Sequence, residues 1–210
     1  MQLKNVHINF KDKNETNCKI GETETVKAIV ILGSRNPEGQ TARAVQAFVE
    51  GFESTGGVTE QCFLPPKTIE RCRQCDDDGW GLCLSKGRCV IEDDFAAIVD
   101  SIRKADFAIF ATPVYFADVS ESLRAFLDRL RRICQHASGK IKLEAKPVIG
   151  ICVAGGGGGA APECAVSMEK VFIHSGFDML DIIPVRRQNL GMKLSVLKTT
   201  GQWLGKANWK

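Results

Sequence analysis

The chain has 210 residues, of which 44% are hydrophobic and 25% are charged, and its formal net charge at pH 7 is +3. This length and composition indicate one soluble globular domain, and so small a net charge gives no reason to expect nucleic acid as a partner. No apolar run reaches the roughly 18 residues of a membrane-spanning helix, and the N-terminus lacks the apolar core of a secretory signal, so we expect no membrane partner.

The predicted elements alternate between strands and helices. Residues 1–24 are polar, apart from alternating Val6, Ile8 and Phe10, and predict a tail or a short edge strand in front of a domain spanning 25–210. Short apolar runs predict five strands, at 26–32, 58–64, 105–111, 147–153 and 179–185. Apolar residues at helical spacing predict helices around 45–52, 95–102, 123–130, 163–175 and 190–204. Asp93 or Asp94 is the expected N-cap of the second helix, and Ser120 that of the third.

Strands and helices alternating at this spacing predict an α/β protein whose parallel sheet is covered on both faces. In open sheets of this kind, ligands bind at the carboxyl ends of the strands. Four unusual segments leave strands at that end: GSRNPEGQT (33–41), a cysteine-rich loop (68–90), TPVYF (112–116) and a glycine run (155–159). Four such loops on one edge predict one site.

The first of these loops has features of a phosphate site. A triphosphate-binding loop has four residues between its glycines and a lysine after the second, whereas here five residues separate Gly33 from Gly39, and Gln40 replaces the lysine. Backbone N–H groups at the helix start, with the hydroxyls of Ser34 and Thr41, suit a phosphomonoester instead. The alternative is an ordinary strand-to-helix turn with a capping residue.

The two later loops suit a flat ligand. TPVYF contains Tyr115, the only tyrosine of the chain, which with Phe116 offers an aromatic edge, although such residues also pack at strand ends. The glycine run follows the fourth strand, not the first, so we reject a dinucleotide-binding fingerprint. Its glycines allow close approach of backbone N–H groups to a ligand, or simply form a flexible loop. Arg186 and Arg187, after the fifth strand, are candidates for contact with a nucleotide phosphate or are solvated.

The chain has nine cysteines, an odd number, and with no export signal they indicate a reducing cytoplasm, where clustered cysteines bind metal more often than they form disulfides. Cys72, Cys75, Cys83 and Cys89 lie within eighteen residues, and four thiolates can ligate a [4Fe–4S] cluster or a zinc ion. The inserted DDDGWGL segment places three aspartates nearby, which disfavour further negative charge, and free cysteines without metal are the alternative. The arginines at 129, 131 and 132 are interpreted as a solvated helix end that offsets the helix dipole. The other cysteines, Cys18, Cys62, Cys134, Cys152 and Cys164, are expected to be buried small residues.

Taken together, GSRNPEGQT, TPVY, the glycine loop and the cysteines resemble the flavodoxin-like NAD(P)H-dependent FMN reductases, and among them the iron–sulfur flavoproteins. The segments RCVIEDDF, ADFAIFATPVYF and SESLRAFLDR carry the most specific part of the resemblance. It implies a three-layer sandwich with strand order 2-1-3-4-5 and bound FMN. By match, the phosphate residues are Ser34, Arg35, Gly39, Gln40 and Thr41; the flavin ring would lie along Thr112, Pro113, Val114, Tyr115 and Phe116; and Ala154, Gly155, Gly156 and Gly157 would close its other side.

The resemblance implies an oxidoreductase that takes hydride from NADH or NADPH into FMN and passes electrons to a small acceptor, with no catalytic side chain. It also implies a homodimer or larger homo-oligomer. Because the insert departs from the compact cysteine run of the iron–sulfur branch, the cluster remains one alternative beside zinc or no metal. Two other function classes stay open: an electron carrier or redox sensor that binds FMN but no nicotinamide, and a metal-stapled interaction domain that would be colourless.

Overall fold

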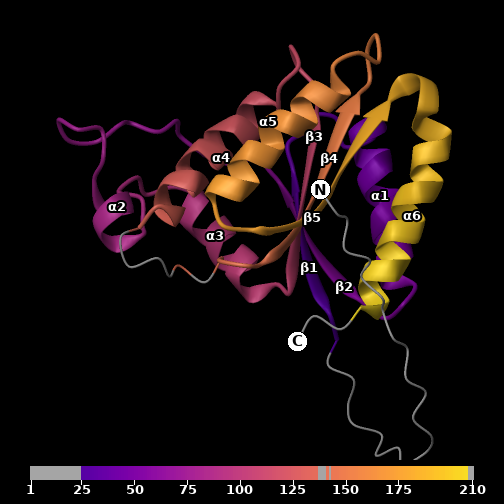
Figure 1. Ribbon diagram of the computed structural model, residues 1–210, viewed down its shortest axis with the longest axis horizontal. Coiled ribbons are helices and arrows are strands. Elements are labelled where there is room, and N and C mark those ends of the chain that lie inside the picture. Colours follow the sequence, from indigo (N-terminus) through magenta and orange to yellow (C-terminus); the bar gives the residue numbers. More distant parts are fainter. Residues whose placement is uncertain (1–24, 137–140, 142, 208–210) are drawn as a thin grey trace, which may run out of the picture.

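The computed structural model describes residues 25–136, 141 and 143–207, so the predicted N-terminal tail lies outside the described residues. It has the predicted flavodoxin-like arrangement, a five-stranded parallel sheet in the order β2-β1-β3-β4-β5 with helices on both faces (Figure 1). The strands are β1 (Lys27–Leu32), β2 (Val58–Phe63), β3 (Phe107–Pro113), β4 (Pro147–Ala154) and β5 (Asp178–Arg186). The helices are α1 (Gln40–Glu53), α2 (Leu82–Lys86), α3 (Phe95–Lys104), α4 (Glu121–Cys134), α5 (Ala161–His174) and α6 (Leu190–Lys206), with a short 3-10 turn at Arg187–Asn189.

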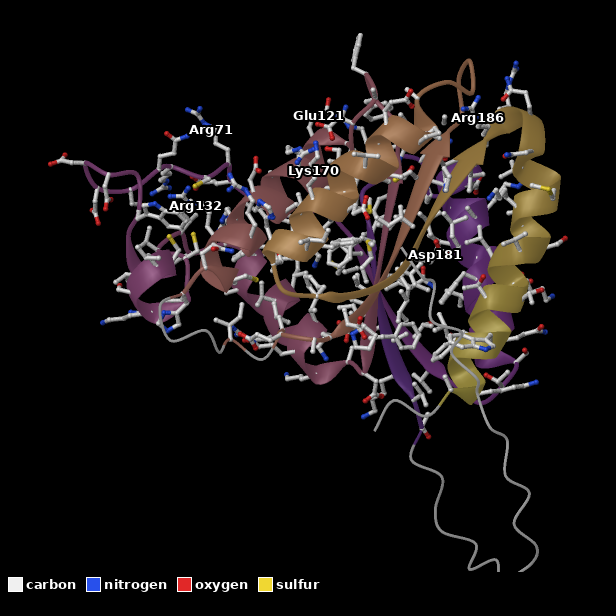
Figure 2. The ribbon with its side chains drawn as sticks, in the orientation of Figure 1. Arg71, Glu121, Arg132, Lys170, Asp181 and Arg186 are labelled. Carbon is white, nitrogen blue, oxygen red and sulfur yellow. The ribbon has the colours of Figure 1, made fainter. Side chains whose placement is uncertain are left out.

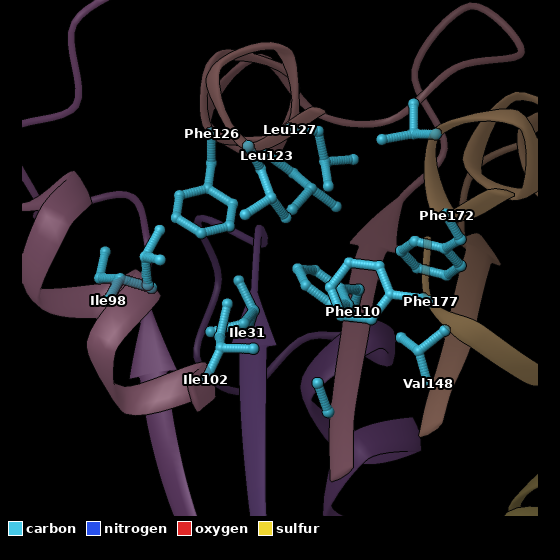
Figure 3. Close-up of a cluster of buried hydrophobic side chains, with 14 of the residues drawn as sticks. Ile31, Ile98, Ile102, Phe110, Leu123, Phe126, Leu127, Val148, Phe172 and Phe177 are labelled. Atoms are coloured by element: carbon cyan, nitrogen blue, oxygen red, sulfur yellow. The ribbon is translucent and has the colours of Figure 1, made fainter. Parts of the chain in front are cut away.

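Each face of the sheet has its own apolar core because successive side chains of a strand point to opposite faces. Along β1, Ala28, Val30 and Leu32 pack with α1 and α6, whereas Ile29 and Ile31 pack with α3, α4 and α5. Figure 3 shows the second core, in which phenylalanines of β3, α4 and α5 meet, with Phe110 and Phe172 ring centroids 5.2 Å apart. Strands buried on both faces explain the continuous apolar runs from which the sheet was predicted.

Local predictions differ from the structure in three places. The predicted strands are displaced by up to two residues, and the helix α2 within the cysteine loop was not predicted. Ser120 caps α4 as predicted, its hydroxyl accepting a hydrogen bond from the Leu123 N–H at 3.4 Å. Asp94 stands at the N-cap of α3 but makes no capping hydrogen bond, and its carboxylate instead accepts the Thr68 N–H at 2.8 Å, back in the cysteine loop. Asp93, the other predicted cap, accepts the N–H of Phe95 at the start of α3 at 3.1 Å. None of the helices in the described ranges is long and apolar enough to cross a membrane.

Candidate functional site

The loop from β1 to α1 leaves the start of α1 without a side-chain cap. Gly39 is the N-cap residue, and the first turn of the helix carries no acidic residue. The first N–H groups of an α-helix have no acceptor within it and carry the positive end of its dipole. Thr41 is buried in this first turn, and the Ser34 hydroxyl shapes the loop through the Asn36 backbone at 3.2 and 3.3 Å. This end of α1 is therefore suited to an anion.

Arg35 contributes less to this anion site. Its side chain is exposed, and its guanidinium lies 3.9 Å from the carboxylate of Glu121, in the first turn of α4. Figure 2 shows Glu121 at the edge of the molecule where the strands end, so Arg35 lies beside the candidate site and faces solvent.

Gln40 joins the first loop to the glycine loop. Its side-chain Nε2 donates to the carbonyl oxygen of Gly155 at 3.4 Å, across 115 residues of sequence. Its Oε1 is buried, with no hydrogen-bond partner among the described residues. A buried acceptor without a donor costs about 1–3 kcal/mol, so this oxygen is suited to a hydroxyl or N–H of a bound ligand.

The glycine loop is shaped from one side and open on the other. Gly158 has a φ of +78°, and a Cβ there would lie 1.9 Å from Oε1 of Gln188, whose Nε2 donates to the Gly157 carbonyl at 2.9 Å. At Gly156 and Gly157 a Cβ would meet nothing within 4 Å. The loop thus has a fixed backbone and an uncovered surface, which a ligand can approach closely.

The TPVYF segment ends in a tight turn that holds two aromatic side chains outward. The N–H and C=O groups of Tyr115 and Asp118 bond to each other, both at 2.9 Å. Phe116 and Ala117, the two central residues, have φ values of +49° and +65°, as in a type I′ turn normally built from glycine or asparagine. Tyr115 is 43% exposed and Phe116 fully exposed. Backbone strain of this kind is concentrated at functional sites.

Asp118 fixes this turn to two helices. Its Oδ1 accepts the Ser167 hydroxyl of α5 at 2.8 Å and forms an ion pair with Arg124 of α4. Burial raises the pKa of Asp118, but the hydrogen bonds from Ser167 and Val119 and the Arg124 cation outweigh it, so the pKa lies below its ordinary value. The carboxylate stays ionised, and the aromatic turn is held in one place.

Thr112 and Pro113 belong to the framework under this turn. The Thr112 hydroxyl is fully buried, accepts the Ser120 N–H at 2.9 Å and donates to the Pro113 carbonyl, so it positions the start of α4. Gly33 also allows this close packing, since a Cβ there would lie 2.5 Å from the Ser120 hydroxyl. Val114 donates its N–H to the Val153 carbonyl at 3.0 Å, and Ala154 ends β4 beside it.

The chemical groups that these three loops present match the parts of an FMN molecule. The uncapped start of α1 suits the FMN phosphate, and the unpaired Gln40 Oε1 suits a hydroxyl of the FMN side chain. The aromatic turn and the exposed backbone of the glycine loop suit the two sides of the flat flavin ring. The predicted FMN residues at the ends of β1, β3 and β4 are thus at one edge of the sheet. Arg186 lies at the same edge, exposed at the end of β5 (Figure 2).

The four cysteines of the loop after β2 line one narrow cavity against α4. Cys72, Cys75, Cys83 and Cys89 share this cavity of about 20 Å³ with Arg73, Arg129 and Arg132. All four are partly buried free thiols. The cavity lies along the far half of α4, because Arg129 and Arg132 come about 12 and 17 Å after Glu121 at 1.5 Å per residue. The cysteines are therefore displaced from the edge at which we expected all four loops to meet.

Arg129 was predicted to be solvated, and this interpretation was wrong. Its side chain is 1% exposed and forms an ion pair with the 2% exposed carboxylate of Asp93, at 2.6 and 3.0 Å. Burial raises the pKa of Asp93, but hydrogen bonds from Arg129 and from the Glu70 and Phe95 N–H groups outweigh it, leaving the pKa low. The pair ties the segment 70–95 to α4. Only Arg131, paired with Asp128 at 3.4 Å, lies at the surface as expected.

The charge beside the cysteines is more positive than we expected, although Asp76 and Asp78 line a neighbouring cavity with Cys75. The aspartates at 76–78 are exposed and do not line the cysteine cavity, whereas three arginines do. Arg132 lies 4.1 Å over the ring of Trp80, from the same insert, and donates to the Gly79 carbonyl. The inserted DDDGWGL segment thus packs Trp80 against α4 and turns its aspartates to solvent.

The described residues do not form a site for a single metal ion. In the described ranges no three histidine, cysteine, aspartate or glutamate side chains are disposed to hold one metal ion together. Tetrahedral zinc needs four ligands about 2.0–2.3 Å from one point, whereas each iron of a [4Fe–4S] cluster takes its own thiolate. Four thiols with cationic N–H donors beside them have the chemical character of ligands to such a cluster. The space between the thiols has a volume of about 20 Å³, which is room for about one water molecule.

Several residues that shape these sites were not identified from the sequence. Asp118, Ser167 and Gln188 act through contacts between distant elements, and no local pattern marks them. Arg129 and Arg132 are spaced to share one face of α4, but this spacing does not distinguish a buried face from a charged surface. The predicted buried cysteines Cys62, Cys152 and Cys164 are buried, whereas Cys134 is only partly so and Cys18 lies outside the described residues.

Sequence comparisons agree with this geometry. The model of a family described as NADPH-dependent FMN reductase matches residues 26–186. An iron-sulfur flavoprotein of Archaeoglobus fulgidus is 32% identical over 105 residues, which cover 50% of this chain and 46% of that protein. An iron-sulfur flavoprotein of Methanocaldococcus jannaschii is 28% identical over 170 residues, covering 80% and 79%. The chain thus aligns with about half of the first relative's length.

Structural comparison supports the same fold. An NAD(P)H:quinone oxidoreductase from Methanothermobacter marburgensis superimposes with a TM-score of 0.62 and 17% sequence identity, covering 88% of this chain and 99% of the other. At this identity the likeness establishes the arrangement of strands and helices, and no more.

Proposed function

Because the chain belongs to the NADPH-dependent FMN reductase family, and is on that ground an FMN oxidoreductase, we propose that it oxidises NADPH or NADH through bound FMN and passes the electrons to a small acceptor. The observation that carries the proposal is the contact of Gln40 with Gly155, which joins the uncapped start of α1 to the bare glycine loop. A nicotinamide nucleotide and a small electron acceptor are the partners.

The chain's own residues bind and orient the cofactor. N–H groups at the start of α1 and the Thr41 hydroxyl hold the phosphate, and Ser34 keeps the loop in its shape. The buried Oε1 of Gln40 would accept a hydrogen bond from a hydroxyl of the FMN chain between the phosphate and the ring. The segment from Thr112 to Phe116 would lie along the ring, with buried Thr112 supporting the turn from below, and Ala154 to Gly157 would close the other side of the ring.

Bound FMN supplies the hydride and electron chemistry. The protein contributes preorganised dipoles, since the backbone N–H groups of the glycine loop offer partial positive charge beside the ring without any acid–base side chain.

An anaerobic titration tests the proposal. The purified protein should show the visible absorbance of an oxidised flavin, and a stoichiometric amount of NADPH or NADH should bleach it rapidly. Bleaching by dithionite but by neither nucleotide would contradict nicotinamide oxidation and favour an electron carrier or redox sensor. A colourless protein that takes up no FMN would contradict both functions.

A second candidate function is that of an iron–sulfur flavoprotein that hands electrons on singly. Four cysteines around one cavity with cationic neighbours favour it, as do relatives named iron-sulfur flavoproteins. Cys72, Cys75, Cys83 and Cys89 would hold a [4Fe–4S] cluster, which supplies one-electron chemistry. Protein purified without oxygen should contain about four irons per chain, and a Cys75→Ala/Cys83→Ala double variant should contain none. One zinc per chain, or no metal, would reject the cluster.

We also propose a homodimer or larger assembly in the cytoplasm. The fully exposed Phe116 and half-exposed Tyr115, held on a strained turn, support burial against a second copy, and the eight cysteines of the described part are free thiols, as in a reducing compartment. Sedimentation at several concentrations tests the assembly; a monomer at micromolar concentration would contradict it.

A further inference from the structure

Arg129 lines the cysteine cavity, and one of its N–H groups has no hydrogen-bond partner among the described residues. Its Nη1 donates to Asp93 at 2.6 Å and to the Glu70 carbonyl at 3.1 Å, and its Nη2 to Asp93 at 3.0 Å and to the Ile91 carbonyl at 3.4 Å. Four of the five guanidinium N–H groups are therefore paired. The fifth, on Nε, is buried with no hydrogen-bond partner in the described part of the chain.

Arg132 repeats this arrangement one turn further along α4. Its guanidinium lies over Trp80 and donates through Nη2 to the Gly79 carbonyl, which fixes the plane of the group. Its Nε is also buried and lacks a hydrogen-bond partner among the described residues. Residues three apart share one face of a helix, and both arginines line the cavity that contains the four cysteines. In Figure 2, Arg132 lies beside the loop that leads into α2, far from Glu121.

Buried N–H donors in native proteins almost always have partners, so two orphans at one cavity indicate an acceptor. The cysteine sulfurs are the atoms of suitable chemistry that share the cavity. We propose that Arg129 and Arg132 are positioning residues of the iron–sulfur site, whose Nε–H groups donate hydrogen bonds to sulfur atoms of the cluster or of its cysteine ligands. The inference rests on the second candidate function, the cluster.

This arrangement has a consequence for the reduction potential. Reduction adds an electron, and so negative charge, to the cluster, and N–H donors on the sulfurs stabilise the more negative state. Two donors from cationic groups therefore raise the potential, which makes the cluster easier to reduce by the flavin. Removing one donor should lower the potential without removing any ligand.

The test is a redox titration of the 210-residue chain after anaerobic reconstitution. Arg132→Lys is the main variant, because lysine keeps the positive charge and can remain over Trp80 but has no Nε–H. Arg131→Lys is the matched control, since Arg131 pairs with Asp128 outside the cavity. Arg129→Lys is the second variant, with a thermal melt to report whether its pairing with Asp93 survives.

We expect Arg132→Lys to retain about four irons per chain. At a fixed potential its ratio of oxidised to reduced cluster should rise about tenfold, which corresponds to a reduction potential about 59 mV more negative for one electron. Arg131→Lys should match the wild type. Equal reduction potentials in the wild type and Arg132→Lys would overturn the inference but not the presence of the cluster. A bound water would then be the acceptor of the Nε–H hydrogen bonds. A wild-type protein without iron would overturn both this inference and the proposed cluster. If NADPH still bleached the flavin of that protein, the reductase proposal would survive.

Discussion

Replacing Asp93 by asparagine should destabilise this protein more than any surface charge change. Asp93 and Arg129 are almost fully buried and meet in two hydrogen bonds of 2.6 and 3.0 Å. Asparagine keeps the size of the side chain but leaves the guanidinium without its counter-charge in the interior. The same carboxylate also accepts the Glu70 and Phe95 N–H groups, at 2.9 and 3.1 Å, so the change also weakens the attachment of the cysteine loop.

The magnitude follows from the cost of an unpaired buried charge. Removing one partner of a buried ion pair costs about 3–5 kcal/mol, against a total stability of about 5–15 kcal/mol for a domain. For a protein of this length, 1 kcal/mol corresponds to about 2–4 °C in Tm, so the expected fall is about 6–20 °C.

Thermal and urea unfolding followed by circular dichroism measure this loss, with Asp100→Asn as the control. Asp100 pairs with Arg103 at 2.7 Å but is 57% exposed, so its loss should cost at most about 1 kcal/mol. An Asp93→Leu/Arg129→Met double variant should recover much of the stability, because apolar replacement removes both charges. If Asp93→Asn melts no lower than Asp100→Asn, the pair does not hold the loop to α4 and the reasoning fails.

Four further expectations concern the FMN site and pH. Thr41→Val should weaken FMN binding by about ten- to a hundred-fold, the cost of a hydrogen bond to a charged group, and an unchanged Kd in a fluorescence titration would contradict the phosphate role. Tyr115→Ala should lower flavin occupancy or turnover at unchanged Tm, because the side chain is at the surface; normal kinetics would count against it. Gly158→Ala should lower the Tm and Gly156→Ala should not, since only Gly158 has positive φ and close contact with Gln188; equal melts would refute this. Asp93 and Asp118 have lower pKa values in the folded state, so the stability they contribute should be complete above the unfolded pKa of about 3.9 and be lost as the pH falls through the folded values. Urea unfolding midpoints measured between about pH 6 and pH 2.5 would detect this loss. Midpoints that rise as the pH falls would contradict it.

The sequence by itself determined the sheet and its covering helices, and predicted the edge at which we expect a ligand. The continuous apolar runs of β1, β3 and β4 are sufficient for this, because strands buried on both faces must be apolar throughout. The cap of α4 at Ser120 was equally predictable, since a hydroxyl that bonds three residues ahead is a local event. Periodicity and capping depend on neighbours in the chain, and these are written in the sequence.

Only the tertiary structure decided where charge and strain lie. The same periodicity that placed arginines on α4 could not tell that Asp93, 36 residues away, buries Arg129, or that Trp80 covers Arg132. Positive φ at Phe116 and Ala117 has no sequence signal, because Asp118 stabilises that turn through α4 and α5 and not through a glycine. Gln40 meets Gly155 across 115 residues. The burial and pairing of polar groups depend on which elements pack together in space, and local sequence propensity does not predict these contacts.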